Sequence, residues 1–527
     1  MATAATDSRD RLPRFALAAA FLLVSFGIIA AASLCDDAYI TLRTVDHFVH
    51  GYGLRWNIDE RVQTFTHPLW LFALTSVYVF TREPYYTTLA VSIVCAIAGL
   101  VLLARLARTP MTAALVLLVA GSSHAFIGYS TTGLENPLSN LLIALYAGQL
   151  FTQPRTQRRL YWLALLSALL LLNRLDYALL IAPSLAYESW RSRSRRTIVT
   201  LVYGFIPLFA WELFSVIYYG SFVPNTAYAK LTNQFPRETL VAHGFAWAWF
   251  TLSRDWPTVL VVVVAAIAGA IWQRRARGLT CAIGCFAYVA YTIYIGGDFM
   301  GGRFWLAPFF FALSYLAQCP LPLTRWISIG IIVSALFLPV RTATFGGSPL
   351  DTIGSNALVW DDRAFYAQQD GLIRLGFHAR GPLRKWAITE LDDTKAHVVV
   401  LKAVGMQGYW AGAKTHIIDP LALADPLLAR LHPLPDPSMA PGHLFRALPN
   451  GYVRSIKEGR NDIVEPHLHA FYDRLSTVIR DPIFAPARLW TTLQLICGRY
   501  QSLLREYEAS PAAAEATRLG DQSMTGE

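Results

Sequence analysis

The chain of 527 residues is 54% hydrophobic and 15% charged, with a formal net charge of +10 and a mean hydropathy of +0.38. Soluble domains carry closer to ~25% charge, so the composition excludes an ordinary soluble enzyme and predicts a polytopic α-helical membrane protein. Arginines are interleaved with apolar segments, which favours membrane topology over nucleic-acid binding. The six cysteines contain no CxxC pair, so we predict neither a disulfide framework nor a metal site from them.

The first apolar run, residues 15–34, contains no charged residue and is long enough to cross a bilayer. We interpret it as a retained helix rather than a signal peptide, with the arginine-rich N-terminus in the cytoplasm. Asp36 and Asp37 follow in what we predict to be the first extracytoplasmic loop. Carboxylates there either provide a general base or merely solvate the helix end.

Residues 68–80 are apolar but too short to cross a bilayer, so we predict an interfacial or re-entrant helix. If the first run is counted as a span and residues 68–80 are left out, eleven spans are expected. The arginine-rich loops then all fall on the cytoplasmic side. The ten further spans are expected at residues 85–104, 111–128, 136–151, 160–173, 177–189, 197–218, 257–273, 279–295, 303–319 and 326–340.

The same topology places nearly every carboxylate at a helix end on the extracytoplasmic face. Ionisable groups at membrane depth are costly and tend to mark function, so loops that share one face predict a site. Besides the acidic pair, the candidate site residues are the cationic or titratable Arg43, His67, Lys230 and Arg303. Four further candidates carry hydroxyl, carboxyl or amide groups: Tyr39, Glu135, Asn225 and Asp298.

From about residue 341 onward no stretch is long and apolar enough to span a bilayer. We predict buried strands at residues 397–402 and 415–419. The expected organisation is a membrane catalytic domain at residues 1–340, followed by an extracytoplasmic α/β domain at 341–527.

Several motifs together resemble the GT-C glycosyltransferases. The DDAYITLR stretch, HGYGLRWN and TFTHPLW look like the first extracytoplasmic loop of that family. The later motifs STTGLE, YGSFVPNTAYAK, GGDFMGGRF and GYWAGAKTHIIDPLALAD are similar to those of the terminal β-(1→2)-arabinofuranosyltransferases of mycobacteria and their bacterial relatives. The resemblance covers about residues 34–443.

This resemblance implies the GT-C fold and transfer of a sugar, arabinofuranose, from decaprenyl- or undecaprenyl-phosphate. With such a donor, the residues expected to bind its phosphate are Arg43, His67, Lys230 and Arg303. The residues expected to bind the sugar or the acceptor are Tyr39, Glu135, Asn225 and Asp298. The implied acceptor is a glycan or glycoprotein outside the cytoplasmic membrane of a bacterium, in cell-envelope synthesis. No nucleic-acid partner and no cofactor are expected. We also expect no divalent metal in the chemistry, although the acidic pair has the hard oxygen ligands that a cation prefers.

Each candidate also has a structural interpretation. Tyr39 and Trp70 could be anchors at the membrane interface, and His67 could cap a helix. Glu135 could place a favourable charge at the start of a helix. Asn225 suits a turn. Ion pairs are equally open for Arg43 with Asp46, Arg174 with Asp176, and Asp298 with Arg303.

Two other functions stay open from the residues alone: a transporter or flippase of a lipid-linked sugar, and a scaffold for envelope assembly. Transporters place charges near the midplane and often contain inverted repeats, whereas here the charges gather at one face. Within the acidic pair we favour Asp36 as the base, because it is nearer the predicted helix end, and expect Asp37 to orient the sugar or anchor the loop.

Overall fold

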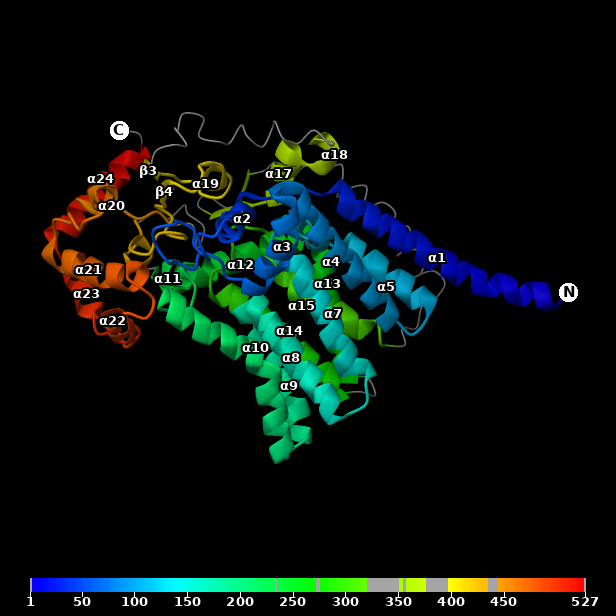
Figure 1. Cartoon of the computed structure of the whole chain (residues 1–527). Coiled ribbons are helices and arrows are strands. Elements are labelled where there is room, and N and C mark those ends of the chain that lie inside the picture. The colour runs from blue at the N-terminus through cyan, green and yellow to red at the C-terminus, as the bar shows by residue number, and fades with distance from the viewer. Residues whose placement is uncertain are drawn as a thin grey trace. The chain divides into compact units, whose positions relative to one another are not determined.

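The computed structural model describes residues 2–232, 235–271, 275–319, 350–353, 357–375, 397–434 and 444–525. The chain divides into two compact units, each assembled from segments distant in sequence (Figure 1). Unit 1 comprises Met1–Cys35, Glu83–Leu208 and Glu238–Ala379; unit 2 comprises Asp36–Arg82, Phe209–Arg237 and Arg380–Glu527. The functional division at residue 340 stays a prediction, and it differs from this division because two earlier segments belong to unit 2.

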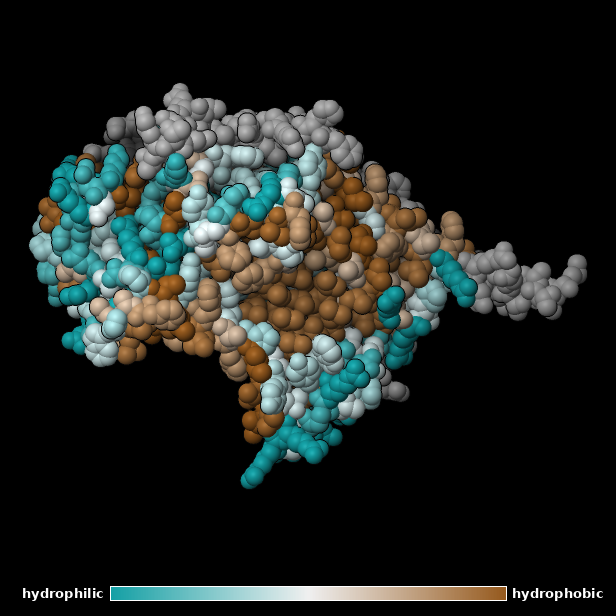
Figure 2. Space-filling model, viewed as in Figure 1, coloured by the Kyte–Doolittle hydropathy of each residue, from teal (hydrophilic) through white to brown (hydrophobic). Residues whose placement is uncertain are grey.

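Unit 1 consists mainly of apolar helices. Within it α1 packs along α5, α4 along α7, and α14 against both α9 and α13. Figure 2 shows apolar side chains gathered over its helices, as expected where a surface faces lipid. Its elements are α1 (Ala2–Ala30), α4 (Pro84–Leu106), α5 (Pro110–Ser122), α6 (His124–Tyr129), α7 (Asn136–Thr152), α8 (Gln157–Asn173), η1 (Leu175–Tyr177), α9 (Ala178–Arg191), the first part of α10 (Arg195–Tyr219), α12 (Arg237–Arg254), α13 (Trp256–Ile271), α14 (Arg275–Tyr294), η2 (Arg303–Trp305), α15 (Leu306–Leu316), β1 (Leu350–Ile353), β2 (Ala357–Trp360), α17 (Asp362–Asp370) and α18 (Leu372–Leu375).

Local sequence explains where these helices begin. Glu83 precedes Pro84, and its carboxylate accepts the backbone N–H groups of the next residues of α4. Thr109 and Thr156 cap α5 and α8 through their hydroxyl oxygens. Such caps satisfy N–H groups that have no partner inside the helix.

Most expected spans correspond to helices, but two regions differ. The expected span 111–128 is broken at Ser123, whose extended backbone ends α5 and whose Oγ accepts the N–H of Phe126 to start α6. The helix α12 was not predicted, because its Arg, Glu and His residues weaken the apolar pattern. It bends by 100° into α13 at Asp255. The last expected span, 326–340, lies outside the described residues.

Four of the described helices are long and apolar enough to cross a membrane: Leu12–Ala30, Pro84–Leu106, Arg195–Tyr219 and Ala276–Tyr294. The bent pair α12 and α13 makes a fifth if it counts as one span. Several other apolar helices are shorter than the ~20 residues that a straight crossing requires. The chain is thus a polytopic helical membrane protein, and the count of eleven stays a prediction.

Unit 2 combines helices with one small parallel sheet. The strands β3 and β4 pair in parallel, with His397 opposite Thr415 and Val400 opposite Ile418, which confirms both predicted strands. β1 and β2 of unit 1 form a separate antiparallel pair. The elements of unit 2 are α2 (Asp36–Val49), α3 (Pro68–Thr81), the end of α10, α11 (Asn225–Leu231), β3 (His397–Val400), α19 (Met406–Trp410), β4 (Thr415–Ile418), η5 (Leu428–Arg430), α20 (Tyr452–Glu458), α21 (Pro466–Arg480), α22 (Pro486–Ile496), α23 (Gln501–Glu508) and α24 (Pro511–Thr525).

Candidate active site

The acidic pair lies at the start of a helix and not in a loop. α2 begins at Asp36, so Asp36 and Asp37 both occupy its first turn. The expectation that DDAYITLR forms a loop was therefore wrong. Carboxylates in the first turn interact favourably with the helix dipole, which explains why the helix starts there.

The carboxylate of Asp36 is occupied by the protein itself. Oδ2 accepts the N–H of Gly405 at 3.0 Å, and Oδ1 accepts the N–H of Met406 at 2.7 Å. A Cβ on Gly405 would lie 1.9 Å from the backbone oxygen of Asp36, so only glycine allows this approach. Burial raises the pKa of Asp36 to about 6, against the opposing effect of these hydrogen bonds. Asp36 therefore holds α19 against α2.

Asp37 has different surroundings. Its side chain is half-buried. Within the described part of the chain, no hydrogen bond or ion pair engages its carboxylate. Of the two aspartates, Asp37 is the one whose oxygens are available to accept a proton, so the geometry weighs against our preference for Asp36 as the base.

Arg43 is a structural residue. Its Nε donates to Trp56 O at 2.8 Å, its Nη2 donates to Thr415 O at 2.8 Å, and its Nη1 donates to Gly408 O. The side chain is 1% exposed, and burial lowers its pKa to about 9. A phosphate contact of Arg43 stays a prediction, and the geometry argues against it, because each guanidinium nitrogen already donates to a backbone carbonyl. Nor does Arg43 form an ion pair with Asp46, whose carboxylate accepts from Tyr78.

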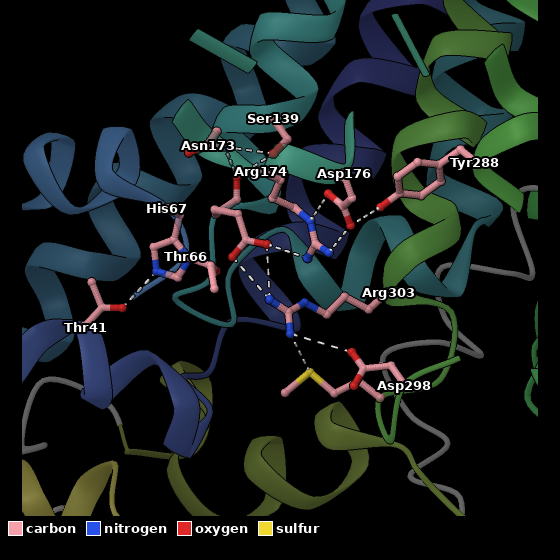
Figure 3. Close-up of polar contacts among 12 residues, drawn as sticks. Thr41, Thr66, His67, Ser139, Asn173, Arg174, Asp176, Tyr288, Asp298 and Arg303 are labelled. Atoms are coloured by element: carbon pink, nitrogen blue, oxygen red, sulfur yellow. Dashed lines mark hydrogen bonds and ion pairs between the residues drawn. The ribbon is translucent and has the colours of Figure 1, made fainter. Parts of the chain in front are cut away.

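Tyr39, His67 and Trp70 are buried. The Tyr39 ring packs edge-on against Tyr409, with 5.6 Å between the ring centroids. His67 lies 2.8 Å from Thr41, measured from Nε2 to Oγ1 (Figure 3). His67 occupies the N-cap position of α3, but its side chain makes no capping hydrogen bond. Burial argues against Tyr39 and Trp70 as surface anchors. A sugar or phosphate role for Tyr39 and His67 stays a prediction.

The two candidates on α11, Asn225 and Lys230, have different surroundings. The amide of Asn225 donates to three backbone carbonyls, those of Ala422, Leu423 and Asp425, at 3.0–3.1 Å. It therefore fixes α11 to this turn, as the structural interpretation expected, and has no donor left for a sugar. Lys230 lies in the last turn of α11 and is exposed.

In unit 1, Glu135 forms the centre of a buried charge network. Figure 3 shows other members of this network, Arg174, Asp176 and Arg303. Its carboxylate accepts from Arg174 at 3.0 Å and from Arg303 at 3.1 Å. Arg174 also pairs in a bidentate manner with Asp176, at 3.0 and 2.5 Å. Glu135 thus joins the start of α7 to η1 and η2.

The network extends to two further groups. Asp176 accepts from the hydroxyl of Tyr288 at 3.0 Å, and Arg303 lies 3.8 Å from Asp298. The expected pairs of Arg174 with Asp176 and of Asp298 with Arg303 are confirmed. Three carboxylates surround two guanidinium groups, so the charge of Arg303 is already balanced, which weakens its case as a phosphate ligand.

A second cluster, in unit 2, was not proposed from the sequence. His416 on β4 lies 2.8 Å from Asp59 and 4.0 Å from the buried Glu60. Burial alone would lower the pKa of His416, but the neighbouring carboxylates outweigh it and raise the pKa. The available signal was a histidine in an otherwise apolar strand, THIID.

No family model matches the chain. It is 26% identical, over 499 residues, to the terminal β-(1→2)-arabinofuranosyltransferase of Mycobacterium tuberculosis, covering 75% of this chain and 78% of that protein. The expected resemblance is confirmed. The enzyme of the same description from Corynebacterium glutamicum is 28% identical over 342 residues, or 54% of this chain and 48% of that protein. The expected class of enzyme, a glycosyltransferase, is confirmed with it.

Two solved structures are also similar. The crystal structure of ArnT from Cupriavidus metallidurans, bound to undecaprenyl phosphate, aligns with a TM-score of 0.49 and 13% identity. The alignment covers 76% of this chain and 85% of the ArnT chain. The arabinofuranosyltransferase AftD from mycobacteria aligns with a TM-score of 0.33 and 15% identity, over 78% of this chain and 32% of that chain. At these scores neither likeness establishes a shared fold.

Proposed function

We propose that the chain transfers arabinofuranose from decaprenyl- or undecaprenyl-phosphate to a glycan or glycoprotein outside the bacterial cytoplasmic membrane. Sequence similarity to two arabinofuranosyltransferases supports the sugar, and the apolar helices support a donor carried by a lipid. The proposal includes the GT-C fold, eleven spans, a cytoplasmic N-terminus and an extracytoplasmic domain at residues 341–527.

One structural observation supports the mechanism: the Asp36 carboxylate accepts two backbone N–H groups, whereas no hydrogen bond or ion pair among the described residues engages the Asp37 carboxylate. In the proposed reaction Asp37 takes the proton of an acceptor hydroxyl, and the hydroxyl oxygen bonds to the anomeric carbon of the donor. The bond from that carbon to the phosphate oxygen breaks, and the polyprenyl phosphate leaves with the electron pair. In this proposal the exposed Lys230 compensates the charge gained by the phosphate.

The test is a transfer assay with the full-length protein reconstituted in nanodiscs. The protein receives either synthetic polyprenyl-phosphate arabinofuranose or a nucleotide-linked sugar, together with an oligoarabinoside acceptor. We expect the acceptor to gain one pentose, detected by mass spectrometry, with the lipid donor but not with the nucleotide sugar. The same transfer is expected when EDTA is present. Transfer from the nucleotide sugar, or none from the lipid donor, would overturn the proposal; activity restored to a chelated sample by Mg²⁺ would overturn the metal-free chemistry.

A further inference from the structure

The helix α22 buries polar side chains and exposes several of its large apolar side chains. Arg488, Thr491 and Thr492 are buried. Leu489, Trp490 and Leu493 are 42%, 59% and 51% exposed. An ordinary helix on a soluble domain shows the opposite pattern, with its apolar face against the core.

The neighbouring sequence continues this character. Between Pro482 and Gly498 the only charged residue is Arg488, and its side chain is buried. Phe484, just before the helix, is 76% exposed. The outward face therefore carries no charge, and exposed apolar side chains of this size indicate an interaction surface rather than contact with water.

Arg488 ties α22 to the last turn of α10. Its two Nη groups donate to Ile217 O at 2.8 Å and to Tyr218 O at 2.9 Å. The carbonyls of a last helical turn lack partners within the helix, so the guanidinium both completes the end of α10 and fixes α22 beside it. A Cβ on Gly220 would lie 2.3 Å from Val478 Cγ1 and 3.4 Å from Thr492 Oγ1, which shows how closely the segments approach.

The helix to which α22 is tied is itself long and apolar enough to cross a membrane. α10 has 25 residues, and its exposed Phe209 and Leu213, in the same unit as α22, are suited to lipid. The apolar face of α22 thus lies next to the point where a spanning helix ends. At 11 residues, α22 is too short to cross the bilayer.

We propose that α22 is an interfacial helix that inserts Leu489, Trp490 and Leu493 into the lipid at the level where α10 leaves the membrane. Tryptophan is enriched at this depth, and the apolar face of an interfacial helix is buried about 5–10 Å into the headgroup and acyl boundary. The helix thereby holds unit 2 at the membrane surface, where a lipid-borne donor is available.

The proposal is tested by spin-label accessibility in full-length protein in phosphatidylcholine and phosphatidylglycerol nanodiscs. Cys497 is the exposed cysteine among the six, so the background variant is Cys497→Ser. Labels are placed by Trp490→Cys and Leu493→Cys, with Glu515→Cys on the exposed face of α24 as the matched control. Thermal unfolding of each labelled protein confirms that it is folded, and Leu489→Cys replaces either site that fails.

Collisions with oxygen, which concentrates in lipid, are expected to be several-fold more frequent at 490 and 493 than at 515. Collisions with a water-soluble nickel chelate are expected to be several-fold less frequent. Equal accessibility at all three sites would mean that α22 faces water. Protection from both reagents at 490 and 493 would mean contact with protein, such as a second copy of the chain. Either result would overturn the proposal.

Discussion

Two adjacent aspartates in the first turn of α2 have different tasks because their neighbours differ. Asp36 accepts two backbone N–H groups that are 369 and 370 residues away in sequence. The sequence alone identified the acidic pair as the candidate base, but it could not distinguish the two members. The deciding contacts come from Gly405 and Met406, and nothing in the local sequence near residue 36 indicates them.

Arg43 and Lys230 are expected to respond differently to substitution. Arg43→Gln leaves buried carbonyls without donors, so it should lower stability by about 2–5 kcal/mol without changing the donor KM of the folded fraction. Lys230→Ala should change the unfolding temperature little, because the side chain is exposed, and should raise the donor KM by roughly 10- to 150-fold. Thermal unfolding and steady-state kinetics on both variants check this. A higher donor KM in folded Arg43→Gln would restore a phosphate role to Arg43.

Asp425 should make the stability of unit 2 depend on pH. Burial, with repulsion from Glu60, raises its pKa to about 7. A carboxyl whose pKa is raised by folding contributes stability that is present below about pH 4 and lost as the pH rises through 7. The wild-type free energy of unfolding should therefore fall by on the order of 1–4 kcal/mol between pH 5 and pH 8 through Asp425. Asp425→Asn should abolish this part of the fall.

The measurement is thermal unfolding of wild type and Asp425→Asn at pH 5 and pH 8. The exposed Asp473 provides the control, since Asp473→Asn should retain the wild-type difference between the two pH values. An unaltered difference in Asp425→Asn would show that another group carries the pH dependence.

At the scale of elements, sequence periodicity located α4, α7, α10 and the strands β3 and β4, where long apolar runs or β-branched residues dominate. It failed where tertiary contacts override the local pattern. Asp255 accepts the N–H of Ala125 at 2.8 Å and the hydroxyl of Thr258 at 2.7 Å, at the sharp bend between α12 and α13. Sequence periodicity also missed α22 as a membrane element, because the segment is too short to be recognised by its length.

Glu135 should stabilise the junction of α7, η1 and η2. Glu135→Gln leaves two buried guanidinium groups facing a neutral amide, and breaking a buried pair costs about 3–5 kcal/mol. The unfolding temperature of the variant should fall accordingly. The ion pair of the exposed Arg460 with the half-buried Asp462 serves for comparison, since Asp462→Asn should cost about 0–1 kcal/mol. Equal effects of the two substitutions would show that the Glu135 network contributes no more than a surface pair.

At the scale of the whole molecule, composition and the alternation of arginine-rich loops predicted a polytopic helical membrane protein. The division into units could not be predicted from the order of segments in the sequence, because residues 36–82 and 209–237 pack with residues more than 140 positions further along the chain. Side-chain hydrogen bonds such as those of Asn225 and Arg43 hold these segments together, and such pairings leave no periodic signal.

The predicted topology can be tested with two engineered cysteines. In the Cys497→Ser background, Glu515→Cys should react with a membrane-impermeant maleimide in intact spheroplasts, because residues 341–527 are expected outside. A cysteine introduced at Arg193, in an expected cytoplasmic loop, should react only after lysis. The reverse pattern would invert the topology and remove the proposed extracytoplasmic site.

The role of Asp37 as the general base is tested by sugar transfer in two matched variants, Asp37→Asn and Asp36→Asn, each with donor binding measured on the same folded sample. Asp37→Asn is predicted to bind the lipid donor normally and to lose about 10²–10⁴-fold in the transfer rate. Asp36→Asn is predicted to lower the unfolding temperature, because an amide nitrogen would face a backbone N–H, while its folded fraction keeps measurable transfer. Full activity in folded Asp37→Asn, or its loss in a stable, donor-bound Asp36→Asn, would contradict the account.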